Sequence, residues 1–203
     1  MQISKIKRAL MGDMYEILTD QGGFGWLGDG HAFYVVDDNL DLTSKNLLAI
    51  MDIPADKRRH YTVYEKAYPL PCFDLCPQED ADFELHEVAR VMHAGSEIVL
   101  LADDDGTMVM VYASQLRPCM ADMRPRICLR TSADPDTGEL TLPVVAVFND
   151  MLVSAIIRPL PVELAREILS EMRAACGPAY RYLGDGAETE EPAQISLFER
   201  RAD

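Results

Sequence analysis

Four residues in the middle of the chain carry side chains of the kinds that bind metal ions. Cys72 and Cys76 are separated by three residues, and His86 and His93 follow downstream. Structural zinc sites commonly place about two to four residues between the cysteines and about three to five between the histidines. Here six residues separate the histidines, and a helix would place them about two turns apart on one face, too far to share one ion. We therefore expect buried thiols and surface imidazoles, with no metal and no cofactor.

The residues that could perform catalysis do not form a recognisable pattern. A serine or cysteine nucleophile needs a base and a characteristic surround, and the chain contains neither a GxSxG elbow nor a catalytic cysteine motif. His86-Glu87 lacks the second histidine that a zinc-protease helix requires. The glycines of residues 22–30 lead into the β-rich run 32–36 and not into a helix, so they do not match a phosphate-binding loop. The acidic turn 103–105 lacks the ligand spacing of a calcium loop. We expect a protein that is not an enzyme, with an enzyme of unrecognised class as the alternative.

The charge of the chain argues against strong binding to nucleic acid. The formal net charge is −15, of which residues 184–203 contribute −4, so the remainder carries −11. Non-specific affinity for DNA comes from the neutralisation of phosphates, which an acidic protein performs poorly. Direct binding to nucleic acid is therefore expected to be absent or weak. Three local basic clusters are interpreted as solvated surface charge, with a nucleic-acid patch as the alternative: Lys5, Lys7 and Arg8; Lys57, Arg58 and Arg59; Arg124, Arg126 and Arg130.

Composition is typical of one globular unit. Of 203 residues, 48% are hydrophobic and 26% charged, which suffices for a buried core. No apolar run approaches the ~20 residues of a membrane span, and the basic N-terminus is not followed by the apolar core of a secretory signal. Five cysteines, an odd number, favour reduced thiols over a disulfide framework. These features predict a cytoplasmic protein that does not contact membranes.

The pattern of apolar residues predicts the elements. Apolar runs joined by Gly or Asp predict hairpins, and further strands are expected at residues 61–68 and 126–131. Three- and four-residue apolar spacing predicts helices. The predicted hairpins join residues 15–18 to 32–36, 97–102 to 107–112 and 142–148 to 151–157. The predicted helices cover residues 3–12, 43–51, 83–92 (with Gly95 as the C-terminal stop) and 161–177. A strand remains possible at 83–92. We expect an α+β fold with a mainly antiparallel sheet and three to four helices in residues 1–180, with a possible subdomain boundary near 117–125.

Residues 181–203 are expected to form a flexible acidic tail. Residues 184–193 are acidic, are interrupted by Gly and Pro, and could not build a core. The apolar pair Leu197-Phe198 close to the end of such a tail therefore needs a physical reason, and burial against a partner is one. Burial of either side chain against that partner would stabilise the contact by about 1.5–3 kcal/mol.

The tip of this tail, Gln194-Ile195-Ser196-Leu197-Phe198, resembles the pentapeptide by which bacterial polymerases and repair proteins bind the sliding clamp, the processivity ring of the replicative DNA polymerase. The usual form is Gln, an aliphatic residue, Ser or Asp, Leu, Phe, and this chain departs from it only by Ile195 in place of the commoner Leu. The resemblance implies that Gln194 hydrogen-bonds in a polar subsite and that Leu197 and Phe198 fill a hydrophobic pocket. Ile195 would add a smaller apolar contact, and Ser196 would shape the backbone.

The resemblance covers five residues and implies a place of action. We expect a non-enzymatic accessory protein of bacterial DNA replication or repair that the sliding clamp recruits through residues 194–198. Three alternatives remain. The tail could deliver a nuclease or hydrolase to DNA, or the protein could come from a mobile element and block the clamp. The pair Leu197-Phe198 could also fold back on its own globular unit as an added strand or plug.

Overall fold

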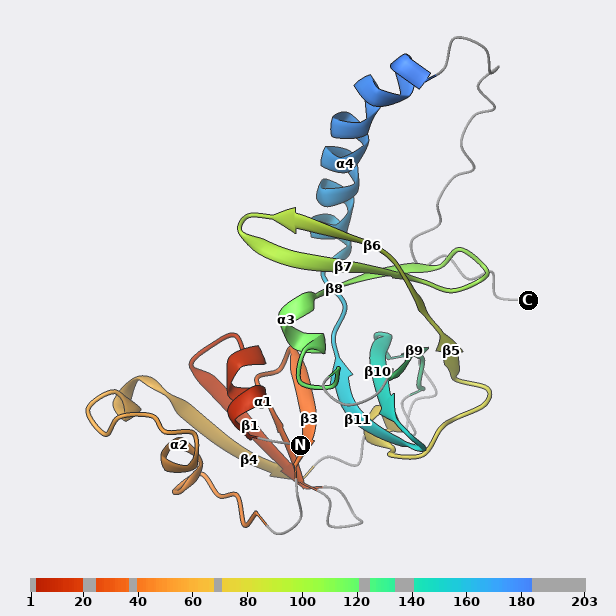
Figure 1. The fold of residues 1–203 in the computed structure, drawn as a ribbon. Helices are drawn as coiled ribbons and strands as arrows, with labels where there is room; N and C mark the ends of the chain where they lie inside the picture. Colours follow the sequence, from red (N-terminus) through yellow and green to blue (C-terminus); the bar gives the residue numbers. More distant parts are fainter. Residues whose placement is uncertain are drawn as a thin grey trace.

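The computed structural model describes residues 3–19, 25–36, 40–67, 71–120, 125–133 and 141–183. Within them, two sheets and four α-helices form the fold shown in Figure 1. The predicted α+β class with mainly antiparallel strands is confirmed. The chain returns from the smaller sheet to the larger one between α3 (Ala113–Leu116) and β9 (Arg126–Arg130).

The larger sheet has eight strands in the order β4-β1-β2-β3-β11-β10-β9-β5. Every described pair in it is antiparallel except β1 with β4, which is parallel. The strands are β1 (Met14–Thr19), β2 (Gly25–Gly28), β3 (Ala32–Val36), β4 (Thr62–Ala67), β5 (Asp82–Glu84), β9 (Arg126–Arg130), β10 (Val144–Asn149) and β11 (Leu152–Ile157).

The smaller sheet consists of β6 (His86–His93), β7 (Ser96–Ala102) and β8 (Met108–Tyr112). Its β7–β8 hairpin, closed by the turn at residues 103–106, confirms the predicted one. Because side chains alternate along a strand, Val99 and Leu101 pack in the core shared with the larger sheet, whereas Ile98 and Leu100 pack under α4. The smaller sheet is therefore a layer with a core on each face.

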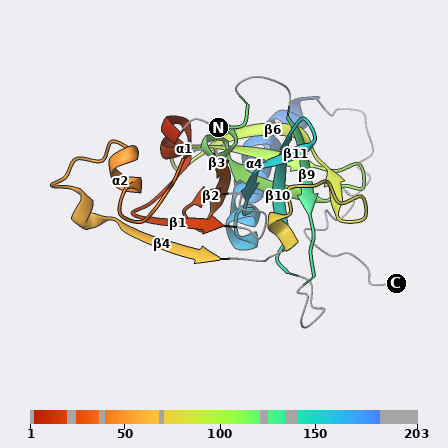
Figure 2. The same ribbon diagram turned by 90° about the horizontal axis from the view of Figure 1, so that it is seen from below.

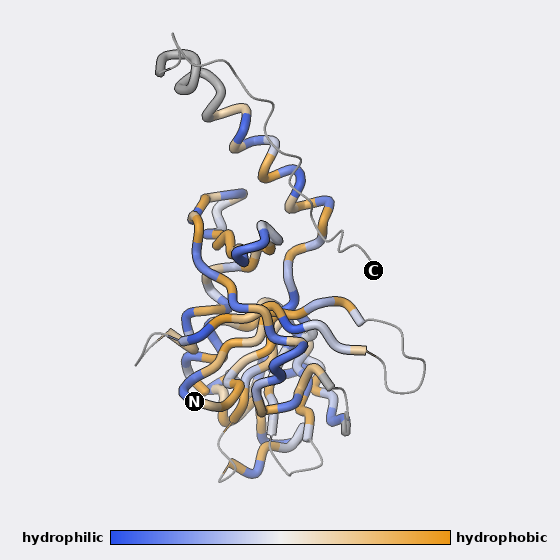
Figure 3. Tube along the Cα trace, turned by 90° about the vertical axis from the view of Figure 1, so that its right-hand side faces the viewer, coloured by the Kyte–Doolittle hydropathy of each residue, from blue (hydrophilic) through white to orange (hydrophobic). Residues whose placement is uncertain are grey.

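Four α-helices complete the fold: α1 (Ile3–Ala9), α2 (Leu47–Ile50), α3 (Ala113–Leu116) and α4 (Val162–Leu183). Two short 3-10 helices, η1 (Arg58–His60) and η2 (Pro71–Phe73), precede β4 and follow it. Apolar and polar residues alternate along α4 (Figure 3), whose apolar side covers the smaller sheet. Helix α1 ends before the expected Gly12, and α4 continues past the expected stop at Gly177. No helix in the described residues has the length and apolar character needed to cross a bilayer.

The helix predicted at residues 83–92 is wrong, because this stretch forms β5 and β6. Gly95 does not end a helix. Ala94 and Gly95 have φ angles of 47° and 80° and form the two-residue turn between His93 and Ser96, which pair across the β6–β7 hairpin. Two residues with positive φ suit the right-handed twist of the flanking strands. The apolar spacing of this stretch fits both the helical period of about 3.6 residues and the strand period of about two. Pairing of β5 with β9 and of β6 with β7 favours the strands.

The predicted hairpin between residues 15–18 and 32–36 is also wrong, because residues 25–28 of the glycine-rich stretch form β2, which lies between β1 and β3 and pairs with both. Gly28 is required there by close packing. A Cβ atom at Gly28 would lie 2.3 Å from Cδ1 of Phe33 and 2.4 Å from the carbonyl oxygen of Ala32. The strand therefore needs a residue without a side chain at this position.

We expect Gly28→Ala to lower the free energy of unfolding by about 1–3 kcal/mol, because the backbone of β3 must move to admit the methyl group. Gly12→Ala is the matched control, since the nearest atom to its Cβ is 3.9 Å away, and its effect should stay within about 0.5 kcal/mol. Urea denaturation of both variants measures the difference. Equal effects would contradict the packing argument.

Candidate functional site

The largest polar cluster of the described residues is centred on Arg130, whose side chain is fully buried near the end of β9. Strand β5 pairs with β9 so that Asp82 lies directly opposite Arg130. Nε of Arg130 donates to Oδ1 of Asp82 at 2.7 Å, and Nη2 donates to Oδ2 at 2.8 Å. This two-point contact is the geometry in which a planar guanidinium binds a carboxylate best.

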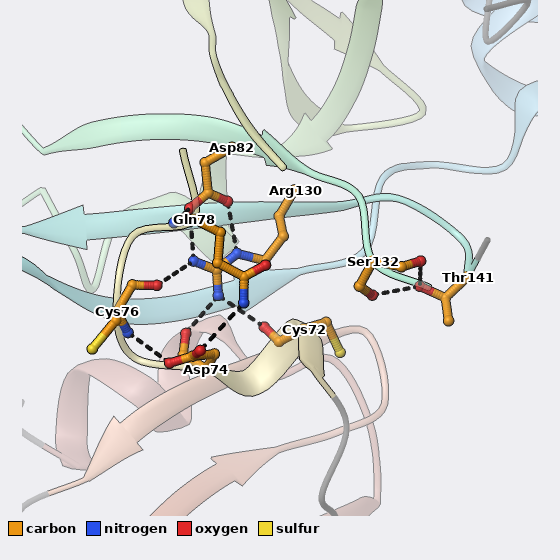
Figure 4. A network of polar contacts seen from close by, with 8 residues as sticks. All are labelled: Cys72, Asp74, Cys76, Gln78, Asp82, Arg130, Ser132 and Thr141. Atoms are coloured by element: carbon orange, nitrogen blue, oxygen red, sulfur yellow. Dashed lines mark hydrogen bonds and ion pairs between the residues drawn. The ribbon is translucent and has the colours of Figure 1, made fainter. Parts of the chain in front are cut away.

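The remaining donors of Arg130 bind the backbone of the loop that carries the two cysteines (Figure 4). Nη1 donates to the carbonyl oxygens of Cys72, at 3.3 Å, and Asp74, and Nη2 donates to the carbonyl oxygen of Cys76 at 2.9 Å. With the bonds to Asp82, five hydrogen bonds use the five N–H groups that a guanidinium offers. The alternate carbonyls of residues 72, 74 and 76 therefore wrap around one cation.

The same loop is fastened by its own side chains. Asp74 Oδ1 accepts a hydrogen bond from the backbone N–H of Cys76 at 2.9 Å, and Asp82 Oδ2 accepts one from the backbone N–H of Gln78 at 2.7 Å. Phe73 packs edge-on against Trp26 and Phe33, with ring centroids 5.1 and 5.2 Å apart. Arg130 thus joins the loop, the edge strand β5 and the neighbouring strand β9 into one unit.

This arrangement is suited to holding structure and not to chemistry. The guanidinium has no N–H group left for a ligand. The loop cysteines contact Arg130 through their carbonyl oxygens, and their Sγ atoms lie on opposite sides of the cluster in Figure 4. We refer to Arg130, Asp82 and the carbonyls of residues 72, 74 and 76 as the arginine latch.

The cysteines and histidines singled out in the sequence are not brought together. His86 and His93 occupy the two ends of β6. Nε2 of His86 lies 3.9 Å from Oδ1 of Asp104, and Nδ1 of His93 lies 3.1 Å from Oε2 of Glu171. Within the described part of the chain, no three His, Cys, Asp or Glu side chains gather closely enough to hold a metal ion. The arginine latch uses the backbone carbonyls of residues 72 and 76, which a residue of any type would supply, so it does not require cysteine at either position.

At pH 8, we expect iodoacetamide to modify Cys76 of the native protein at least about 100-fold faster than Cys119 or Cys128. Only the thiolate reacts, and burial raises the pKa of Cys119 to about 12 and that of Cys128 to about 11. Cys76 is exposed. Peptide mapping by mass spectrometry over time measures the three rates, and the urea-unfolded chain, where they should converge, is the control. Comparable rates in the native protein would show that Cys119 and Cys128 are accessible.

Sequence reasoning missed the latch. The prediction that Arg130 belongs to a solvated basic cluster with Arg124 and Arg126 is wrong, because the side chain of Arg130 is buried. The available signal was the alternation of β9, which places Arg126, Cys128 and Arg130 on one face. Arg126 and Arg130 both lie over the ring of Phe148, at 4.5 and 5.5 Å from its centroid.

The residues that the sequence predicts to bind a partner, Gln194, Ile195, Ser196, Leu197 and Phe198, lie outside the described residues. The described structure leads toward them through α4, which begins beside the smaller sheet and projects away from the larger one (Figure 1). Comparison of the chain with protein-family models, curated proteins and solved structures finds no match in any of the three.

Proposed function

We propose that this protein is a non-enzymatic accessory protein of bacterial DNA replication or repair, recruited to the DNA polymerase sliding clamp by residues 194–198. The observation that carries the proposal is the pentapeptide itself, Gln194-Ile195-Ser196-Leu197-Phe198. Its residue types and their order resemble the clamp-binding motif at every position, with Ile195 as a mild departure.

The direction of α4 supports a tethering role. The helix carries the chain away from the larger sheet and ends at Leu183. Ten residues separate Leu183 from Gln194, and ten residues span at most about 35 Å. A clamp bound to the pentapeptide would therefore lie within reach of the globular unit, which raises the local concentration of that unit at DNA.

The energetics of the contact favour reversible binding. Leu197 and Phe198 would each contribute about 1.5–3 kcal/mol when buried, and ordering of the peptide offsets part of that gain. The expected dissociation constant is on the order of micromolar, equivalent to about 8 kcal/mol. Such a contact allows the protein to exchange with other clamp partners.

Titration of purified sliding clamp, followed by calorimetry, tests the proposal with two ligands: the full chain and a synthetic peptide of residues 184–203. Both are expected to bind with dissociation constants that agree within a few-fold. Absence of binding by both up to about 1 mM, where any contact would be weaker than about 4 kcal/mol, would refute the proposal. Binding by the peptide alone would show that the globular unit sequesters its own tail and would contradict recruitment of the full chain.

A further inference from the structure

The basic residues of this acidic protein are unevenly distributed. All five lysines lie between residues 5 and 66. Residues 1–67 hold eight basic and ten acidic residues, a net charge of −2, whereas residues 68–183 hold nine and eighteen, a net charge of −9. The first third of the chain is therefore the part whose net charge opposes the binding of an anion least.

The fold brings two basic clusters of that region together. Lys7 Nζ donates to the carbonyl oxygens of Met51 and, at 3.4 Å, Asp52. Arg58 Nε donates to the carbonyl oxygen of the next residue, Ile53, at 2.8 Å. The side chains of Lys7, on α1, and Arg58, on η1, therefore both bind the backbone of residues 51–53, which follow α2.

The sheet gives an independent reason for this proximity. Helix α1 leads into β1, and η1 leads into β4. These two strands are parallel neighbours in which Met14 pairs with Thr62, so the segments that precede them lie at the same edge of the sheet. Figure 2 shows α1 and α2 on this side of the molecule, beside β1 and β4. We call the six cations the basic edge: Lys5, Lys7, Arg8, Lys57, Arg58 and Arg59.

Ion pairs within the described residues do not neutralise the basic edge. No described ion pair includes any of its six residues, whereas Arg90, Arg117 and Arg130 each contact a carboxylate. Arg8, Lys57, Arg58 and Arg59 are exposed, and Lys5 and Lys7 are half-buried. The acidic residues at the same place are Asp13, Asp52 and Asp56, which are exposed, and Asp29, whose Oδ2 accepts a hydrogen bond from the backbone N–H of Met11 at 2.6 Å, so two positive charges remain in excess.

We propose that the basic edge contacts the phosphate backbone of duplex DNA while the protein is tethered to the clamp. The inference rests on the proposed function in one respect, because the clamp is what brings duplex DNA within reach. Phosphate groups can bind a cluster of exposed cations without any base-specific contact. An excess of two charges gives weak affinity on its own, and the tether makes it effective by supplying a local concentration on the order of millimolar.

Fluorescence anisotropy with a labelled 20-base-pair duplex tests the contact directly, with the full chain and no clamp, at salt concentrations from 50 to 200 mM. The variant Arg8→Gln/Lys57→Gln/Arg59→Gln removes three exposed cations and leaves Lys7 and Arg58, which bind backbone carbonyls. Arg158→Gln/Arg166→Gln/Arg173→Gln is the matched control, since it removes three exposed cations elsewhere and changes the net charge equally. Urea denaturation of both variants verifies the fold.

The basic-edge variant is expected to bind DNA at least about 10-fold more weakly than the wild type at 50 mM salt. Its slope of log K against log salt should fall by up to about 2.7, because each lost phosphate contact removes about 0.9. The control should match the wild type within about two-fold. Equal affinity and slope for the wild type and the basic-edge variant would overturn the inference.

Two further outcomes separate this inference from the proposed function. If the wild type binds DNA as expected and does not bind clamp, the basic edge stands and the proposed function fails. If the basic-edge variant binds DNA like the wild type and loses affinity for clamp in the absence of DNA, the basic edge contacts an acidic protein surface and the inference is wrong.

Discussion

Replacement of Leu197 and Phe198 by alanine is expected to weaken binding of the full chain to the sliding clamp by about 100-fold or more. The two side chains supply the apolar burial of the proposed contact, about 1.5–3 kcal/mol each, and each 1.4 kcal/mol is about a factor of ten. Gln194→Ala should cost only about five-fold, as expected for one hydrogen bond worth about 1 kcal/mol. Surface plasmon resonance with immobilised clamp measures all three constants.

Thr189→Ala/Pro192→Ala is the matched control, because it truncates two uncharged residues of the same segment outside the pentapeptide. It should bind like the wild type. Equal affinity of Leu197→Ala/Phe198→Ala and this control would remove the basis of the proposed function.

The same variants distinguish recruitment from folding back. If Leu197 and Phe198 packed on the globular unit, their truncation would lower the melting temperature, by about 2–4 °C per kcal/mol for a chain of this size. Under the proposed function, both variants should melt with the wild type within about 1 °C. Differential scanning calorimetry without clamp therefore tests the tail independently of any partner.

The second large effect is expected at the arginine latch. Asp82→Ala should lower the free energy of unfolding by about 3–5 kcal/mol, because it leaves the Arg130 guanidinium buried without its counter-charge. Arg130→Met should be as costly, since it leaves the Asp82 carboxylate and three backbone carbonyls without their donor. Urea denaturation gives both values.

The double variant Asp82→Ala/Arg130→Met should cost less than the sum of the single variants by at least about 1 kcal/mol, because the two residues contact each other directly. Arg126→Met is the control on the same strand: Arg126 is exposed and lies over Phe148, and its loss should cost less than about 1 kcal/mol. If Asp82→Ala is as mild as this control, the buried ion pair does not fasten the loop.

Elements whose signals are local could be predicted from the sequence. The hairpin of β7 and β8 has apolar runs on both sides of an Asp-Gly turn, and the whole pattern lies within the 17 residues from Ser96 to Tyr112. The residues of β10 and β11 are adjacent in the same way. The apolar spacing of residues 83–92 fits either a helix or a strand, and the helix predicted from it is wrong.

Contacts between distant residues could not be predicted in this way. The parallel pairing of β1 with β4 and the pairing of Asp82 with Arg130 each join residues 48 apart. Neither the type nor the spacing of neighbouring residues encodes such a pairing, because its free energy comes from the packing of the whole core. In the sequence, Arg130 is therefore indistinguishable from a surface arginine, and only the structure shows that the loop of Cys72 and Cys76 surrounds it.

The sequence by itself determined the α+β class and the one segment with a specific candidate partner. Gln194-Ile195-Ser196-Leu197-Phe198 could be interpreted directly because a linear motif is recognised through its own side chains, in order, without help from the rest of the chain. Only the tertiary structure decided the roles of the charged residues. Arg130 became a buried latch because β5 pairs with β9, and the cations of α1 and η1 became one basic edge because β1 pairs with β4. Both results depend on which strands lie side by side, which only the fold of the whole chain determines.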